Sequence, residues 1–268
     1  MSGKLSIGAA WSEAAAFVRR ERRVLAPVVL GLIMVPAVVA TMVQPPAPAG
    51  ESPEPGAWMI IVLLMIAAMI VGQMVIVLLA NGWHESVGQA IRRSLGRLPV
   101  LILAGLIVMV PVFIAFALVA GGMMTLSGGV PKLQSNLGPG AGIAVLLLIL
   151  ALVFVMIRLL PLIAVVVNGS IGPIAALKHT FGLTRGHFWK LLGFALLLTI
   201  AFGVLGMAVG AVFGSIVTLA LGTPQPWSVS LLLIALVAGL LQAAFVTIYS
   251  AMLARIHAQL EGGATNGT

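Results

Sequence analysis

The chain has 268 residues, of which 61% are hydrophobic and only 7% are charged, and its formal net charge is +8. Soluble globular domains carry about 25% charged residues, so this composition excludes a soluble domain. The sequence therefore predicts an integral membrane protein.

Six long apolar segments follow one another along the chain, and each holds the roughly 20 residues that a helix needs to cross a hydrocarbon core. They are Val24–Val43, Trp58–Ala80, Leu98–Ala120, Ala141–Asn168, Leu191–Leu221 and Ser228–Leu253. The first is longer than the apolar part of a signal peptide, so we expect it to be retained as a span. None alternates with the period of two that a β-barrel lumen would impose. We therefore predict an all-α polytopic bundle of six transmembrane helices, in a single membrane domain over residues 1–268.

Lysine and arginine are distributed unevenly between the loops that connect these spans. If the N-terminus lies inside, all of the 14 basic residues except Lys132 and Arg158 fall in inner loops or at inner ends. Cytoplasmic loops are enriched in Lys and Arg, and the five tryptophans also fall at predicted interfaces. We therefore expect a multi-pass protein of the bacterial inner membrane with both termini in the cytoplasm.

A short motif recurs at the same place in three successive parts of the chain. It reads SIG at Ser6–Gly8, SVG at Ser86–Gly88 and SIG at Ser170–Gly172, and each copy precedes a basic amphipathic stretch and two apolar spans. This arrangement predicts three repeat units and a disordered C-terminal tail. The approximate bounds of the units are 5–80, 85–165 and 169–257, and those of the tail are 258–268.

Each unit is predicted to begin with an amphipathic helix on the cytoplasmic surface. In the second unit Ser86 and Gln89 form a capping-box pattern, and in the third Pro173 suits the first helical turn. The candidate contacts to anionic head groups are six cations of these two units: Arg92, Arg93, Arg97, Lys178, Arg185 and Lys190. Either these cations only enforce the topology, or they bind anionic lipid of the inner leaflet selectively. Membrane lipids, preferentially anionic ones, are the expected partners, and no nucleic-acid partner is expected.

The stretch Arg158–Leu196 carries a more specific pattern. It has an arginine within a span, a proline three residues later, a short polar break, an Ala-Leu pair, a threonine, and then Leu-Thr-x-Gly. The matching residues are Arg158, Pro161, Ala176, Leu177, Thr180, Leu183, Thr184 and Gly186. This pattern resembles that of the bacterial glycerophosphoryl diester phosphodiesterase membrane-domain family and of related six-span proteins. The resemblance implies the membrane domain only, without the phosphodiesterase domain that gives the family its name. The polar break of that family has an acidic residue, whereas this chain has VVNGS.

The sequence offers no constellation for catalysis or metal binding. Its six acidic residues all lie outside the predicted spans, so they cannot form the carboxylate cluster that metal-assisted hydrolysis needs. The four histidines show neither an H-E-x-x-H pattern nor a pair at i, i+4 spacing, and there is no cysteine. We therefore expect a non-catalytic protein with no metal and no cofactor.

Three glycines, Gly206, Gly210 and Gly214, lie four residues apart on one face of the fifth span. Such spacing allows a neighbouring helix backbone to approach closely, so we expect helix packing at this face. The partner helix is either another span of the same chain, which is the preferred reading, or a second copy of the protein.

Arg158 is the one charged residue within a predicted span. If residues 141–168 form one straight helix, Arg158 lies ten residues, or about 15 Å, from Asn168 and close to the middle of the bilayer. An unpaired arginine at that depth costs at least about 2.5 kcal/mol on insertion scales, so it should face the protein interior or a wet cavity. Gln73 and Gln242 are predicted at comparable depth, so the three side chains are expected to form one buried polar layer. This layer either joins helices by hydrogen bonds or binds an anionic head group or small anion.

Two hypotheses from different functional classes follow. The first is a non-catalytic membrane protein that binds or moves a lipid or small amphiphile through Arg158 and the surface cations. The second is a scaffold or assembly subunit that stabilises a partner protein in the membrane and has no substrate of its own. The sequence does not determine the ligand, the direction of any transport, the partner or the oligomeric state.

Overall fold

The computed structural model describes residues 6–45, 53–83, 85–127 and 139–265, and over these ranges it contains helices and connecting turns but no β-strand. In chain order the helices are α1 (Ile7–Arg20), α2 (Arg22–Val29), the π-helical segment η1 (Leu30–Met34), α3 (Val35–Val43), α4 (Trp58–Ala80), α5 (Val87–Ser127), α6 (Pro139–Arg158), α7 (Leu162–Asn168), α8 (Pro173–Leu183), α9 (Phe188–Leu221) and α10 (Val229–Thr265). Within the described ranges, six helical stretches are long and apolar enough to cross a membrane, counting α2, η1 and α3 together and α6 with α7. The predicted all-α class and the six membrane-length helices are confirmed.

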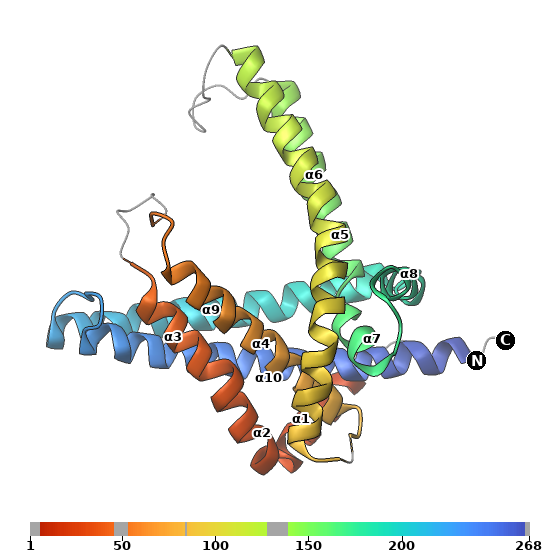
Figure 1. Ribbon diagram of the computed structural model, residues 1–268, viewed down its shortest axis with the longest axis horizontal. Coiled ribbons are helices and arrows are strands. Elements are labelled where there is room, and N and C mark those ends of the chain that lie inside the picture. The colour runs from red at the N-terminus through yellow and green to blue at the C-terminus, as the bar shows by residue number, and fades with distance from the viewer. Residues whose placement is uncertain (1–5, 46–52, 84, 128–138, 266–268) are drawn as a thin grey trace.

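The membrane-length helices form three hairpins that diverge from a common base, as Figure 1 shows. The first hairpin pairs α2, η1 and α3 with α4, the second pairs α5 with α6, and the third pairs α9 with α10. The common base consists of α1, α7 and α8 together with the adjoining ends of α4, α5, α9 and α10. The second hairpin therefore extends away from the other two, whereas the first hairpin also packs along α10.

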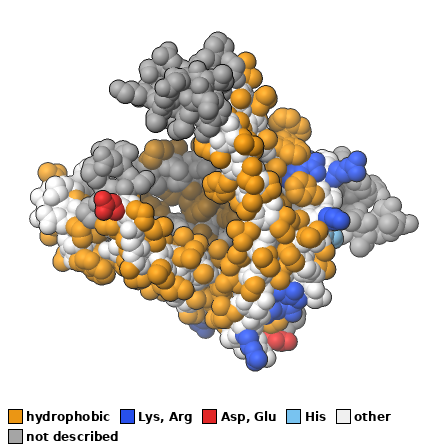
Figure 2. Space-filling model, turned by 45° about the horizontal axis from the view of Figure 1, so that its top comes forward, with side chains coloured by type: hydrophobic (Ala, Val, Ile, Leu, Met, Phe, Trp, Pro, Cys, Tyr) orange, Lys and Arg blue, Asp and Glu red, His pale blue; other side chains and the backbone are white. Residues whose placement is uncertain are grey.

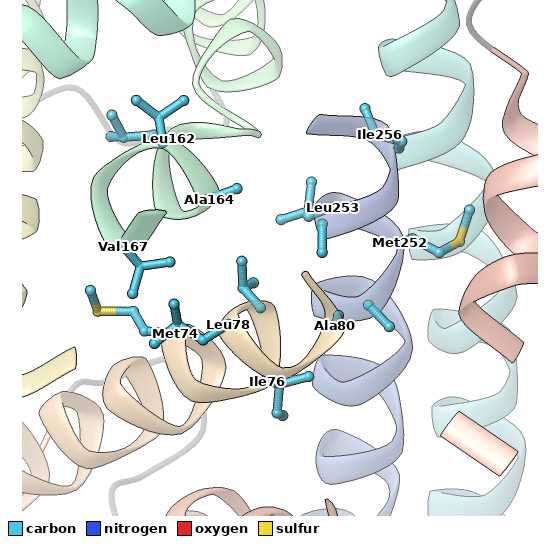
Figure 3. Close-up of a cluster of buried hydrophobic side chains, with 14 of the residues drawn as sticks. Met74, Ile76, Leu78, Ala80, Leu162, Ala164, Val167, Met252, Leu253 and Ile256 are labelled. Carbon is cyan, nitrogen blue, oxygen red and sulfur yellow. The ribbon is translucent and has the colours of Figure 1, made fainter. Parts of the chain in front are cut away.

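The hydrophobic core lies at this base. Figure 3 shows Met74 and Leu78 of α4, Val167 of α7 and Leu253 of α10 turned toward the same interior. The sequence of α7, LIAVVVN, is apolar on every side, and an all-round apolar helix is stable only when it is surrounded by other elements. The short α7 is accordingly buried between α4, α5, α8 and α10.

The outer parts of the hairpins expose apolar side chains. In each of α5, α6 and α9, only 6% of the residues in the most apolar stretch are buried within the protein. The corresponding share in α4 is 33%. Figure 2 shows hydrophobic side chains over the outer surface of the hairpins and the Lys and Arg side chains near the base. Exposure of this kind is unfavourable in water but carries no comparable cost in lipid, because acyl chains are as apolar as the side chains themselves.

Two glycines that the sequence analysis did not single out allow close helix contacts. A Cβ atom added at Gly72 of α4 would lie 2.9 Å from the Leu32 Cβ atom and 3.1 Å from the Leu32 carbonyl oxygen in η1. A Cβ atom added at Gly239 of α10 would lie 3.0 Å from Val38 Cγ2 in α3. Gly72 therefore lets α4 and η1 approach closely within the first hairpin, and Gly239 lets α10 approach α3 of that hairpin.

Several local predictions about helix starts are confirmed, and two are corrected. The backbone N–H of Ser86 donates to Gln89 Oε1 at 3.0 Å, as the capping-box pattern predicts, and Pro173 lies in the first turn of α8. The basic stretch of the second unit does not form a separate surface helix, because α5 continues from Val87 through Pro99 without interruption. The C-terminal tail is not disordered over its described part, because α10 continues to Thr265. The boundaries of the three repeat units stay a prediction.

Candidate functional site at the Arg158 junction

Helix α6 ends at Arg158, and the chain turns through residues 159–161 before α7 begins. Pro161 has no N–H to donate and its ring is incompatible with a continuous helix at the carbonyl four residues earlier, which explains the turn. The straight helix assumed for residues 141–168 is therefore wrong. Arg158 lies at the end of α6 that joins the base. Its predicted position, ten residues from Asn168 on one continuous helix and close to the middle of the bilayer, is therefore corrected.

The Arg158 side chain is half-buried and contacts α8 and its own helix. Its Nη1 atom donates to the backbone carbonyl of Phe181 at 3.3 Å. Its guanidinium carbon lies 5.0 Å from the ring centroid of Phe154 and 5.9 Å from that of Phe181. A cation over aromatic rings at these distances is attracted by the negative ring face. The buried Nε atom of Arg158, however, has no hydrogen-bond partner.

The same cluster of rings extends to the start of α9. The rings of Phe154 and Phe188 are 5.1 Å apart, and Phe188 follows directly after His187 in the chain. The Nδ1 atom of His187 is buried and has no hydrogen-bond partner. The turn that places His187 contains Gly186 at φ +85°, a conformation that L side chains rarely adopt. We call Phe154, Arg158, Phe181, His187 and Phe188 the Arg158 junction.

Thr180 of α8 and Thr184, which follows the end of α8, do not supply the missing partner. Thr180 Oγ1 donates to the Ala176 carbonyl at 2.7 Å, and Thr184 Oγ1 donates to the Thr180 carbonyl at 3.0 Å. No carboxylate of the described residues forms an ion pair with Arg158. The junction therefore holds a permanent cation whose buried Nε–H has no partner, and such a group can donate to a negatively charged oxygen. The buried Nδ1 atom of His187 is also without a partner.

The predicted polar layer of Arg158, Gln73 and Gln242 is not formed. Gln242 on α10 is exposed, and its Nε2 atom lies 3.5 Å from the sulfur of Met69 in α4. Gln73 is half-buried on α4, and no hydrogen bond joins any two of the three side chains in the described structure. The reason is that α6 turns away from its predicted course and belongs to a hairpin that diverges from α4 and α10, as Figure 1 shows.

The six candidate lipid-contacting cations have different environments. Arg93 caps α7, because its Nε donates to the Val167 carbonyl at 3.1 Å and its Nη2 donates to the Asn168 carbonyl at 3.0 Å. Its guanidinium carbon also lies 5.3 Å from the ring centroid of Trp83. Arg97 is half-buried, and the exposed members are Arg92, Arg93, Lys178, Arg185 and Lys190. Contact of these cations with lipid stays a prediction.

The three glycines of α9 do not face a closely packed helix. A Cβ atom added at Gly206, Gly210 or Gly214 would meet no atom within 4 Å. Instead they line an apolar groove of about 190 Å³ between α9 and α10. The expectation of an internal packing partner is therefore corrected, because the small side chains leave the groove open where α10 runs alongside. A second copy of the protein at this face stays a prediction.

Sequence reasoning missed a cluster of ionisable groups at the base. His257 of α10 and His179 of α8 approach Glu261, with Nε2 to Oε1 distances of 3.3 Å and 3.9 Å. These side chains line a cavity of about 510 Å³ between α7, α8 and α10. The i, i+4 spacing of His257 and Glu261 was a signal for their contact, but nothing in the sequence indicated His179. No group of His, Asp or Glu side chains in the described part of the chain is arranged to hold a metal ion.

Comparison with known protein families gives one match, over residues 5–260, to the domain of unknown function DUF7847. The chain belongs to the DUF7847 family. The match covers all three hairpins and the junction, and the resemblance to the glycerophosphoryl diester phosphodiesterase membrane-domain family is not confirmed. No curated protein and no solved structure is significantly similar to this DUF7847 chain.

Proposed function

We propose that this DUF7847 protein is a non-catalytic membrane protein that binds or moves a lipid or another small amphiphile, and that the Arg158 junction receives the anionic head group. The observation that carries the proposal is the pair of buried, unpartnered nitrogen atoms, Arg158 Nε and His187 Nδ1, in a cluster that contains no carboxylate. A buried N–H group without a partner costs about 1–3 kcal/mol, and more when it is charged. An anionic oxygen would remove this cost.

The surroundings of the junction fit an amphiphile better than a free ion. Phe154 of the junction and Trp189, which follows Phe188 in the chain, are exposed, so apolar chains can lie against aromatic rings while the head group reaches Arg158. Lys178 and Arg185 are exposed on and just after α8, and cations near a membrane surface attract anionic lipid. With the proposed topology, the ligand comes from the cytoplasmic leaflet of the bacterial inner membrane.

The proposal is tested by the lipid that co-purifies with the protein. Wild type, Arg158→Gln, Arg158→Lys and the control Arg23→Gln are purified in the same detergent and examined by native mass spectrometry. Arg23 is an exposed arginine of α2 that makes no recorded contact. We expect Arg158→Gln to lose one bound anionic amphiphile, because a charge-assisted hydrogen bond is roughly twice as strong as a neutral one. Arg158→Lys should retain less than wild type, because an ammonium group cannot reproduce the planar fork of a guanidinium.

The outcome for the glutamine variant decides between a ligand site and a structural role. If Arg158→Gln retains the same number of anionic lipids as wild type and Arg23→Gln, the ligand proposal is refuted and Arg158 is a helix-packing residue. Equal loss in Arg158→Gln and Arg23→Gln also contradicts it, because general surface charge would then account for the binding.

A scaffold function is the second candidate, and the open glycine groove of α9 favours it. The groove is lined by Gly206, Gly210 and Gly214 with apolar side chains of α10, and no side chain of the described residues fills it. A transmembrane helix of a partner protein would fit such a small-residue face. If this is the function, Gly210→Leu should abolish co-purification of a membrane partner and leave the bound lipid unchanged, whereas Arg158→Gln should have no effect on the partner.

A further inference from the structure

A second, separate cavity lies between α1 and α10. It has a volume of about 230 Å³ and is lined by Trp11, Ala14, Ala15, Val18, Arg19 and Ile248. None of these residues belongs to the Arg158 junction, so an inference drawn from this cavity does not depend on the function proposed above.

The sequence of α1 explains why the cavity exists. Ala14 faces α10 and is buried, and Ala15 lies beside it on the flank of α1. Ala14 and Ala15 lie between the larger Trp11 and Val18, which are about one helical turn away on either side. The two small side chains therefore leave a hollow on α1, and Ile248 of α10 lines its opposite side. The lining surface is apolar, and Arg19 carries the one charged group among the six residues that form it. An apolar cavity of this kind does not hold ordered water.

Among the residues that the structure describes, Arg19 is the cation that lines the cavity. Arg20 is engaged by Glu21 at 2.9 Å, and the Glu13 carboxylate lies 3.9 Å from Arg255. Arg19 is exposed and has no recorded partner. Trp11, 47% exposed, lies at the other end of the hollow, and tryptophan favours the head-group level of a membrane.

We propose that this cavity binds an anionic phospholipid, with one acyl chain in the hollow between α1 and α10 and the phosphate on Arg19. An apolar hollow with a single cation at its rim matches a molecule that has an apolar chain attached to a negative group. A zwitterionic lipid would gain the contacts of the chain but not the net charge attraction, so the site prefers phosphatidylglycerol over phosphatidylcholine.

The experiment uses the full chain in detergent and a phosphatidylglycerol that carries a photoreactive diazirine near the end of one acyl chain. Cross-linked peptides are identified by mass spectrometry. We expect labels on the α1 segment from Trp11 to Val18 and on the α10 segment around Ile248. Unlabelled phosphatidylglycerol should compete about fivefold better than phosphatidylcholine, the ratio that one cation near a membrane surface provides.

Three variants locate the site. Ala15→Leu fills the hollow and should remove the label from both segments. Arg19→Gln, an exposed change that leaves the hollow intact, should keep the label but abolish the preference for phosphatidylglycerol. The matched control is Arg20→Gln, one residue further along α1 and already paired with Glu21, which should behave as wild type.

Three results would overturn the proposal. The first is a label that persists in Ala15→Leu, because the chain would then lie elsewhere. The second is an equal loss of lipid preference in Arg19→Gln and Arg20→Gln, because this would indicate attraction to the surface in general. The third is a wild-type protein that takes no label and is a dimer by light scattering, while the Ala15→Leu variant is a monomer. A second copy of the protein would then fill the cavity.

Discussion

We predict that Gly72→Ala destabilises the protein, whereas Gly206→Ala does not. The Cβ atom of alanine at position 72 would lie 2.9 Å from the Leu32 Cβ atom, 3.1 Å from the Leu32 carbonyl oxygen and 3.1 Å from Ile33 Cγ1. A Cβ atom is fixed to its own backbone and cannot rotate away, so α4 and η1 must separate until these contacts are of ordinary length. Overpacking of a close contact costs about 1–3 kcal/mol.

Helix propensity acts in the opposite direction at both positions. Alanine is more favourable than glycine within a helix by up to about 1 kcal/mol, which offsets part of the cost at Gly72. We therefore expect Gly72→Ala to lower the free energy of unfolding by about 1–2 kcal/mol. At Gly206 the added Cβ atom meets no atom within 4 Å, so Gly206→Ala should be neutral or slightly stabilising.

The stabilities of Gly72→Ala and Gly206→Ala are compared by titrating each purified variant from mild detergent into sodium dodecyl sulfate and following helix content by circular dichroism. The two variants carry the same chemical change in apolar helices of one protein, so the difference between their midpoints isolates the contact between α4 and η1. Equal midpoints for Gly72→Ala and Gly206→Ala would show that this contact is absent and that the first hairpin is packed differently.

Two further predictions follow from other contacts. Arg93→Ala should lower the free energy of unfolding by about 2 kcal/mol, because two charge-assisted hydrogen bonds to the end of α7 are lost. The control Arg92→Ala removes an exposed side chain without a hydrogen bond or ion pair and should change this free energy by less than about 0.5 kcal/mol. Equal effects of the two variants in the same detergent titration would contradict the capping role of Arg93. For the predicted topology, a cysteine at the exposed Thr223 should react with an impermeant thiol reagent added to intact cells, whereas one at the exposed Ser170 should react only after lysis. Labelling of Ser170→Cys in intact cells would reverse the proposed orientation.

Local sequence signals were sufficient for some features of the site. Arg158 was recognisable as unusual from its apolar surroundings. The predicted span, however, ran through Pro161, whereas α6 stops at Arg158 because a proline lacks the N–H that a continuing helix requires. The contacts of Arg158 with Phe181 and of Phe154 with Phe188 were not recognisable, because each joins residues of different helices. The sequence also did not identify the glycines at close helix contacts. The four-residue spacing predicted such a contact at Gly206, whereas the close contacts are at Gly72 and Gly239.

The sequence by itself determined the membrane class, the number of membrane-length helices and most of the helix starts. Each of these depends on about 20 consecutive residues or fewer, because hydropathy, capping hydrogen bonds and proline geometry act locally along the chain. Only the tertiary structure decided that the hairpins diverge from a common base and that Arg93 donates to the carbonyls at the end of α7. It also decided that Gln73 and Gln242 lie apart from Arg158. These features depend on which faces of different helices meet, and in a chain whose helices are apolar on every side the hydrophobic pattern does not distinguish one face from another.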